Sequence, residues 1–136
     1  MSAPSNVNAT YKTPLARARG MGASHTGVGS FITERLTSIA LLPLCLWAVW
    51  AIIHVAPTGY AGAVAFLRNP VEATLAVLLV AISFRHAQLG MRVVIEDYIG
   101  DHYRRLLLLI LNSAVALVGG ALGVVAILKV AFAAAA

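Results

Sequence analysis

Long apolar runs separated by short polar segments dominate the chain after about residue 30. Two of these runs, Leu36 to Ala56 and Leu106 to Leu128, contain no formally charged residue. Each is long enough for an α-helix, which needs roughly 20 residues to cross about 30 Å of hydrocarbon. The pattern therefore predicts membrane-spanning helices at 36–56 and 106–128.

A third apolar run, Ala73 to Phe84, ends too early to cross a membrane, because it is only about 18 Å long at 1.5 Å per residue. A spanning helix here has to continue to about Asp97, at 71–97. The continuation contains four ionisable side chains before that point: Arg85, His86, Arg92 and Glu96. A charge at membrane depth costs on the order of 3 kcal/mol unless it faces protein, water or a cofactor. The second helix is therefore predicted to have a polar, functional face.

His86, Gly90 and Asp97 share one stripe of this helix. At 100° per residue, Gly90 lies about 40° and Asp97 about 20° around the axis from His86. A porphyrin needs an axial imidazole and a flat slot with little bulk one turn from that ligand, which His86 and Gly90 would supply. The alternative is that His86 is a hydrogen-bonded residue between helices, with no cofactor.

The composition places the whole chain in a membrane. Of the 136 residues, 60% are hydrophobic and 11% charged, with a mean hydropathy of +0.87, far from the balance of a soluble domain. The predicted fold class is an all-α membrane protein with three transmembrane helices, part of a heteromeric bundle. So small a bundle can hardly enclose a site alone, so partner subunits are expected. The single Cys45 excludes a disulfide or a cysteine metal site within the chain.

The net charge of +5 does not indicate nucleic acid, because the basic residues lie in the N-terminal segment and beside apolar runs. Residues 1–30 form a predicted polar, basic tail and 31–136 the membrane anchor. Seven basic residues fall on one predicted side of the membrane: Lys12, Arg17, Arg19, Arg35, Arg92, Arg104 and Arg105. Arg68 and Lys129 fall on the other. The positive-inside rule then predicts a cytoplasmic or matrix N-terminus and an outer, periplasmic C-terminus.

Smaller features give further expectations. Gly119 and Gly123 form a GxxxG pair that would allow close helix packing. Glu72 is expected to be a solvated acid in the first turn of its helix. Trp47 is expected to pack against other side chains.

The segment HAQLGMRVVIEDY, His86 to Tyr98, resembles the signature of the hydrophobic membrane anchor subunit of succinate dehydrogenase, the D chain of respiratory complex II. A second segment, GSFITERLTSIALLPL from Gly29 to Leu44, is similar to the entry of that family's first helix. Here Glu34 stands where the family pattern has Gln. The spans, the short length and the basic tail agree with the family in outline.

The resemblance implies that His86 is an axial ligand of haem b and that Tyr98, with Asp97, binds ubiquinone. Arg35 would reach a haem propionate or the quinone, or would only be a positive-inside anchor. No catalytic residue is assigned. The implied partners are a cytochrome b-type membrane subunit with the other haem ligand, an iron–sulfur subunit, a flavoprotein and membrane lipid.

Two alternatives compete with a succinate:ubiquinone oxidoreductase anchor. One is an anchor of the fumarate reductase type, and the other is a structural or assembly subunit without a cofactor. Succinate oxidation itself needs a flavin and a dicarboxylate site, and electron relay needs clustered cysteines. This chain provides none of these, so it is not expected to be an enzyme alone. The expected location is a bacterial inner membrane, with the mitochondrial inner membrane as the alternative.

Overall fold

The structure is a computed structural model that describes residues 27–133, all of whose regular elements are helices. They are α2 (Gly27–Val55), a 3-10 turn η1 (Ala56–Thr58), α3 (Gly59–Leu67), α4 (Pro70–Tyr98) and α5 (His102–Ala131). Helix α2 begins inside the segment predicted as the tail. The basic residues Lys12, Arg17 and Arg19 lie outside the described residues.

Three helices are long and apolar enough to cross a membrane: Val28–Leu67, where α2 is taken together with α3, then Pro70–Tyr98 and His102–Ala131. This confirms the prediction of an all-α protein with three membrane helices. The second helix does run through the polar segment without interruption. Its 29 residues make it about 43 Å long at 1.5 Å per residue, longer than the hydrocarbon layer.

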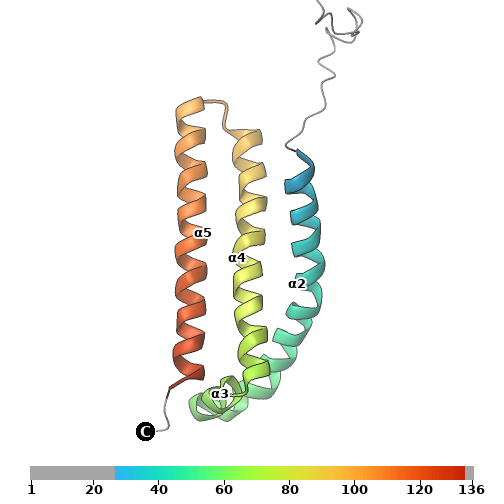
Figure 1. Cartoon of the computed structure of the whole chain (residues 1–136), viewed down its shortest axis with the longest axis vertical. Coiled ribbons are helices and arrows are strands. Elements are labelled where there is room, and N and C mark those ends of the chain that lie inside the picture. Colours follow the sequence, from blue (N-terminus) through green and yellow to red (C-terminus); the bar gives the residue numbers. More distant parts are fainter. Residues whose placement is uncertain (1–26, 134–136) are drawn as a thin grey trace, which may run out of the picture.

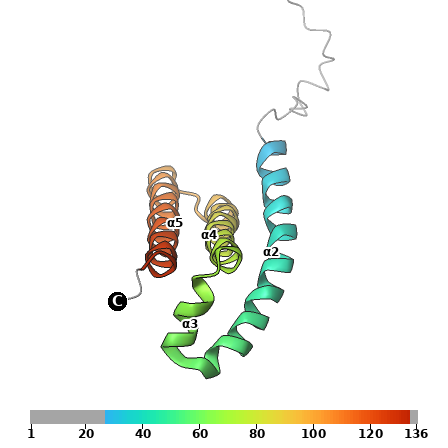
Figure 2. The same cartoon turned by 60° about the horizontal axis from the view of Figure 1, so that its bottom comes forward.

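Helix α4 lies between α2 and α5, which do not pack against each other within the described residues (Figure 1). Helices α2 and α5 begin, and α4 ends, at the end of the bundle that we call the Tyr98 end. At the opposite end, the Pro70 end, α3 lies across the bundle and leads from α2 to α4 (Figure 2). Helices α2 and α4 are therefore antiparallel neighbours.

Helix α3 was not predicted, because Pro57 to Tyr60 has the composition of a turn. The chain does turn there: Gly59 has a φ of 67°, in the left-handed region that favours glycine. The next residues, however, are apolar and form two further helical turns. Asn69 then caps α4 by accepting a hydrogen bond from the Val71 N–H at 2.9 Å.

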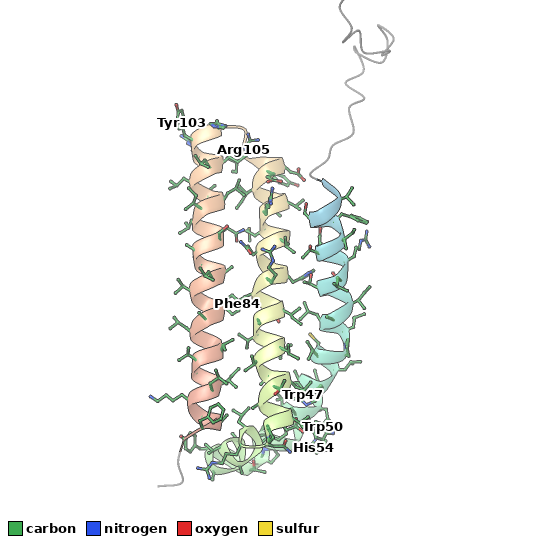
Figure 3. All side chains as sticks on the ribbon, viewed as in Figure 1. Trp47, Trp50, His54, Phe84, Tyr103 and Arg105 are labelled. Atoms are coloured by element: carbon green, nitrogen blue, oxygen red, sulfur yellow. The ribbon has the colours of Figure 1, made fainter. Side chains whose placement is uncertain are left out.

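The glycines of α5 form its contact with α4. A Cβ built on Gly119 would lie 2.5 Å from Cε1 of Phe84, and one built on Gly123 would lie 2.7 Å from Cγ1 of Val80. The Phe84 side chain lies between the two helices in Figure 3. The predicted close approach at the GxxxG pair is therefore confirmed.

The three helices have almost no core of their own. Among the described residues, five side chains are buried: Leu44, Ala51, Ala73, Leu89 and Ile95. Many large apolar side chains are exposed instead, such as Leu46 and Leu117, each at 74%. Such a surface requires lipid or another subunit against it.

Candidate functional site

One side of α2 faces α4, and its character changes along the helix. Buried or half-buried positions recur along it at helical spacing: Thr33, Glu34, Thr37, Ser38, Leu41, Leu44, Ala48 and Ala51. The first four are polar and lie toward the Tyr98 end, while the others are apolar. The polar half of α2 therefore lies beside the polar half of α4.

His86 lies at this α2–α4 boundary and is half-buried. Its Nδ1 atom is 3.0 Å from the Thr37 Oγ1. Its Nε2 atom has no hydrogen-bond partner among residues 27–133. His86 is thus held by one ring nitrogen while the other remains available.

Gly90, one turn from His86, borders open space. A Cβ built there would meet no atom within 4 Å outside its own helix backbone. The contrast with Gly119 and Gly123 on α5 is clear, because side chains of α4 pack directly against those glycines. An imidazole with a free Nε2 beside a residue without a side chain fits one edge of a haem, with other walls supplied from outside the chain.

Asp97 and Tyr98 lie at the end of α4, and Tyr98 is about 18 Å along the axis from His86 at 1.5 Å per residue. Asp97 is exposed, and Tyr98 is 82% exposed. Within the described part of the chain, neither side chain has a hydrogen-bond or ion-pair partner. Both are available to a ligand or another subunit near the membrane surface.

Arg35 is not brought to His86. It is two residues from Thr37, which places it about 200° around α2, on the side away from α4. Its guanidinium lies over the ring of Phe31, 5.0 Å from the centroid. The residue of α2 that does contact His86 is Thr37, which the sequence analysis did not identify.

The remaining ionisable groups of the polar segment are paired. Arg92 Nε lies 2.7 Å from Glu96 Oε1, one turn along the same helix. Arg85 Nη1 donates to Gln88 Oε1 at 2.6 Å, and Gln88 Nε2 donates to Ser113 Oγ of α5 at 3.0 Å. A membrane helix tolerates so many polar residues here because most of them form hydrogen bonds or ion pairs with one another.

Asn112 adds to the α4–α5 contact by donating from Nδ2 to the Gln88 carbonyl oxygen at 2.9 Å. Gln88 and Asn112 were missed because a polar, uncharged residue in an apolar run gives no sign of its partner. Their presence at membrane depth was the only signal, as such residues commonly bond between helices.

The expectation that Glu72 is a solvated acid is wrong. Its Oε2 accepts a hydrogen bond from the Trp47 indole Nε1 at 2.8 Å, which joins α2 to α4 near the Pro70 end. Trp47 also stacks on Phe66 of α3, with ring centroids 6.3 Å apart. Trp47, Trp50 and His54 all lie at this end in Figure 3. These contacts hold α2, α3 and α4 together at the end of the bundle opposite Asp97 and Tyr98.

Comparison with known proteins gives a consistent result. A family model described as succinate dehydrogenase/fumarate reductase transmembrane subunit matches residues 9–121. A protein of Rickettsia conorii named succinate dehydrogenase hydrophobic membrane anchor subunit is 34% identical over 106 residues, covering 74% of this chain and 81% of the relative. A protein of the same name from Rickettsia felis is 30% identical over 101 residues, covering 74% and 80%. No solved structure matches the chain.

Proposed function

Because the chain belongs to the family of succinate dehydrogenase/fumarate reductase transmembrane subunits, we propose that it anchors a succinate:ubiquinone oxidoreductase and supplies part of two cofactor sites. At the first site it supplies an axial ligand of haem b, and at the second it supplies residues that bind the ubiquinone to be reduced. The observation that carries the proposal is His86, whose Nε2 is free at membrane depth, among residues 27–133, beside the open space at Gly90.

His86 would bind the haem iron through Nε2, with Gly90 leaving room for the porphyrin. When bound, haem b supplies a one-electron carrier inside the membrane. The chain's own contribution is to hold the imidazole between α2 and α4 and to keep one turn of α4 free of bulk. The open edge of this position requires a second membrane subunit with the other ligand.

Tyr98 and Asp97 would serve the quinone at the Tyr98 end. The Tyr98 hydroxyl can donate a hydrogen bond to a quinone carbonyl oxygen, and this bond strengthens as negative charge develops on that oxygen. Reduction to ubiquinol takes two electrons and two protons. Asp97, exposed beside Tyr98, is suited to transfer protons from the aqueous side.

Arg35 would act on a group that another subunit presents, because it lies on the side of α2 away from α4. A haem propionate or the quinone remains its proposed partner. Its guanidinium carbon lies 5.0 Å from the centroid of the Phe31 ring, and within residues 27–133 its N–H donors have no hydrogen-bond acceptor, so they are available to such a group.

The proposed complex also contains a cytochrome b-type subunit, an iron–sulfur subunit and a flavoprotein, since this chain lacks the chemistry for succinate oxidation. The relatives are bacterial, and this supports a bacterial inner membrane. We propose a cytoplasmic N-terminus, because Arg92, Arg104 and Arg105 lie toward the Tyr98 end and Arg68 and Lys129 toward the other.

The quinone role is tested by Tyr98→Phe in the purified complex. We expect the ubiquinone reductase rate to fall about 10-fold or more, because a charge-assisted hydrogen bond contributes roughly 1.5–3 kcal/mol. Succinate oxidation with an artificial acceptor should be unchanged, since the flavin site lies in another subunit.

Tyr103→Phe is the matched control, because Tyr103 has the same 82% exposure and lies at the same end of the bundle. It should leave both rates unchanged. Equal loss of both activities in Tyr98→Phe, or equal effects of the two substitutions, would contradict the quinone role.

A structural subunit without cofactor is the second candidate. The bond from His86 to Thr37 favours it, since that alternative predicts a histidine bonded between helices. A complex that assembles without any b-type haem, and whose ubiquinone reduction is unchanged by Tyr98→Phe, would establish it. An anchor of the fumarate reductase type falls within the same family description and would be recognised by a preference for menaquinol oxidation over ubiquinone reduction.

A further inference from the structure

We propose that Thr37 is the positioning residue of His86: its hydroxyl oxygen accepts a hydrogen bond from Nδ1–H and so leaves Nε2 unprotonated to bind iron. The inference rests on the proposed haem function of His86 and adds a residue of α2 to that site. It concerns which ring nitrogen holds the proton, and how the ring is oriented.

The Thr37 hydroxyl has one hydrogen and three neighbours. Its Oγ1 lies 2.9 Å from the carbonyl oxygens of both Thr33 and Glu34, and 3.0 Å from His86 Nδ1. Carbonyl oxygens only accept, so a hydrogen pointing toward them leaves the lone pairs of Oγ1 for Nδ1. Such bonding to the preceding turn is common for threonine in helices.

The opposite assignment is less favourable. If Thr37 donated to Nδ1, then Nε2 would carry the hydrogen. Among residues 27–133, Nε2–H would have no acceptor, and a half-buried donor without an acceptor in a membrane is costly. With Nδ1 protonated, the free lone pair of Nε2 points to the atom that would bind it.

The arrangement also fixes the ring. Thr37 is β-branched, which restricts its χ1 angle, and its oxygen is additionally held by two carbonyls of its own helix. Histidines that bind metals usually donate their second N–H to such an acceptor, and this donation orients the ring and raises its basicity. Thr37 would therefore stabilise ferric haem relative to ferrous haem.

The test compares Thr37→Val with the parent in the intact purified complex, using readouts other than activity. Valine keeps the shape and removes the acceptor. We expect haem to be lost about 10- to 100-fold more readily to an apoprotein acceptor, the range typical for losing such a partner. We also expect the haem midpoint potential to rise and the low-temperature EPR signal of the ferric haem to shift.

Thr37→Ser keeps the hydroxyl and should restore all three properties. Thr33→Val is the matched control, because the Thr33 hydroxyl donates to the Gly29 carbonyl of its own helix, at 2.8 Å, and not to α4. It should behave like the parent. If Thr37→Val fails to assemble, Thr37→Ala removes the same acceptor without added bulk and carries the same expectation.

Parental haem retention, potential and EPR signal in Thr37→Val or Thr37→Ala would overturn the proposal. His86→Ala, measured beside them, separates the haem function from the positioning role. Loss of haem in His86→Ala with no effect at Thr37 refutes only the positioning role. Full haem with an unchanged spectrum in His86→Ala refutes the haem function and the positioning role together.

Discussion

At Gly90, the proposed function depends on the open space beside the residue. The chain would accommodate a larger side chain there, since nothing lies within 4 Å of a Cβ placed on it. A porphyrin bound to His86 would occupy that space. Steric hindrance at Gly90 should therefore affect the haem rather than the fold of the chain.

We predict that Gly90→Leu lowers the haem content per flavin several-fold while the complex still assembles. Gly90→Ala should have a much smaller effect, because one methyl group adds little bulk, and leucine and alanine both favour a helix over glycine. The measurement is haem and flavin content of the purified complexes. Equal, full haem content in both variants would show that no porphyrin lies against Gly90.

The sequence singles out His86 and Asp97 by their spacing and Tyr98 by the family resemblance, and their roles stay predictions. The hydrogen-bond partner of His86 was not predictable. That partner depends on which turn of α2 lies beside which turn of α4, and neither helix alone specifies this register. Thr37, Gln88 and Asn112 became visible only when the helices were placed side by side.

Helices α4 and α5 depend on small residues for their separation. Gly119 allows the Phe84 ring to approach, and a Cβ there would lie 2.5 Å from Cε1 of that ring. At the neighbouring Gly120, the nearest atom would be the Phe84 Cβ at 3.4 Å, an ordinary contact. The same substitution by alanine would therefore clash with Phe84 at Gly119 but not at Gly120.

We predict that Gly119→Ala destabilises the assembled complex by about 1–3 kcal/mol, the usual cost of overpacking. Gly120→Ala should be nearly neutral. Thermal denaturation of the purified complexes, followed by circular dichroism, gives the comparison. The same decrease in midpoint for both variants would mean that glycine flexibility, and not the Phe84 contact, matters at these positions.

The membrane helices were predictable because their charge-free length leaves no other solution in hydrocarbon. The extent of α4 followed from the same reasoning, since the apolar run before Arg85 is too short. Helix α3 and the Trp47–Glu72 bond were not predictable. Both arise from how α2 returns to α4, which hydropathy does not describe.

At the scale of the whole molecule, the three membrane helices do not bury enough side chains to form a core of their own. Only five described side chains are buried, and exposed apolar residues cover all three membrane helices. Within residues 27–133, helix α2 reaches α4 but not α5, so the candidate haem position lies at an open boundary. Both observations are consistent with a subunit whose site is completed by partners.

The most direct measurement is the haem-to-flavin ratio of the intact complex carrying His86→Ala, obtained from reduced-minus-oxidised spectra. His54→Ala is the control, because His54 lies in the same protein's membrane helices but bonds through Nδ1 to the Trp50 carbonyl oxygen of its own helix, at 2.8 Å. We predict that b-type haem is present in the parent and in His54→Ala and is lost or altered in its spectrum in His86→Ala. An unchanged ratio and spectrum in an assembled His86→Ala complex would contradict the haem function of this chain.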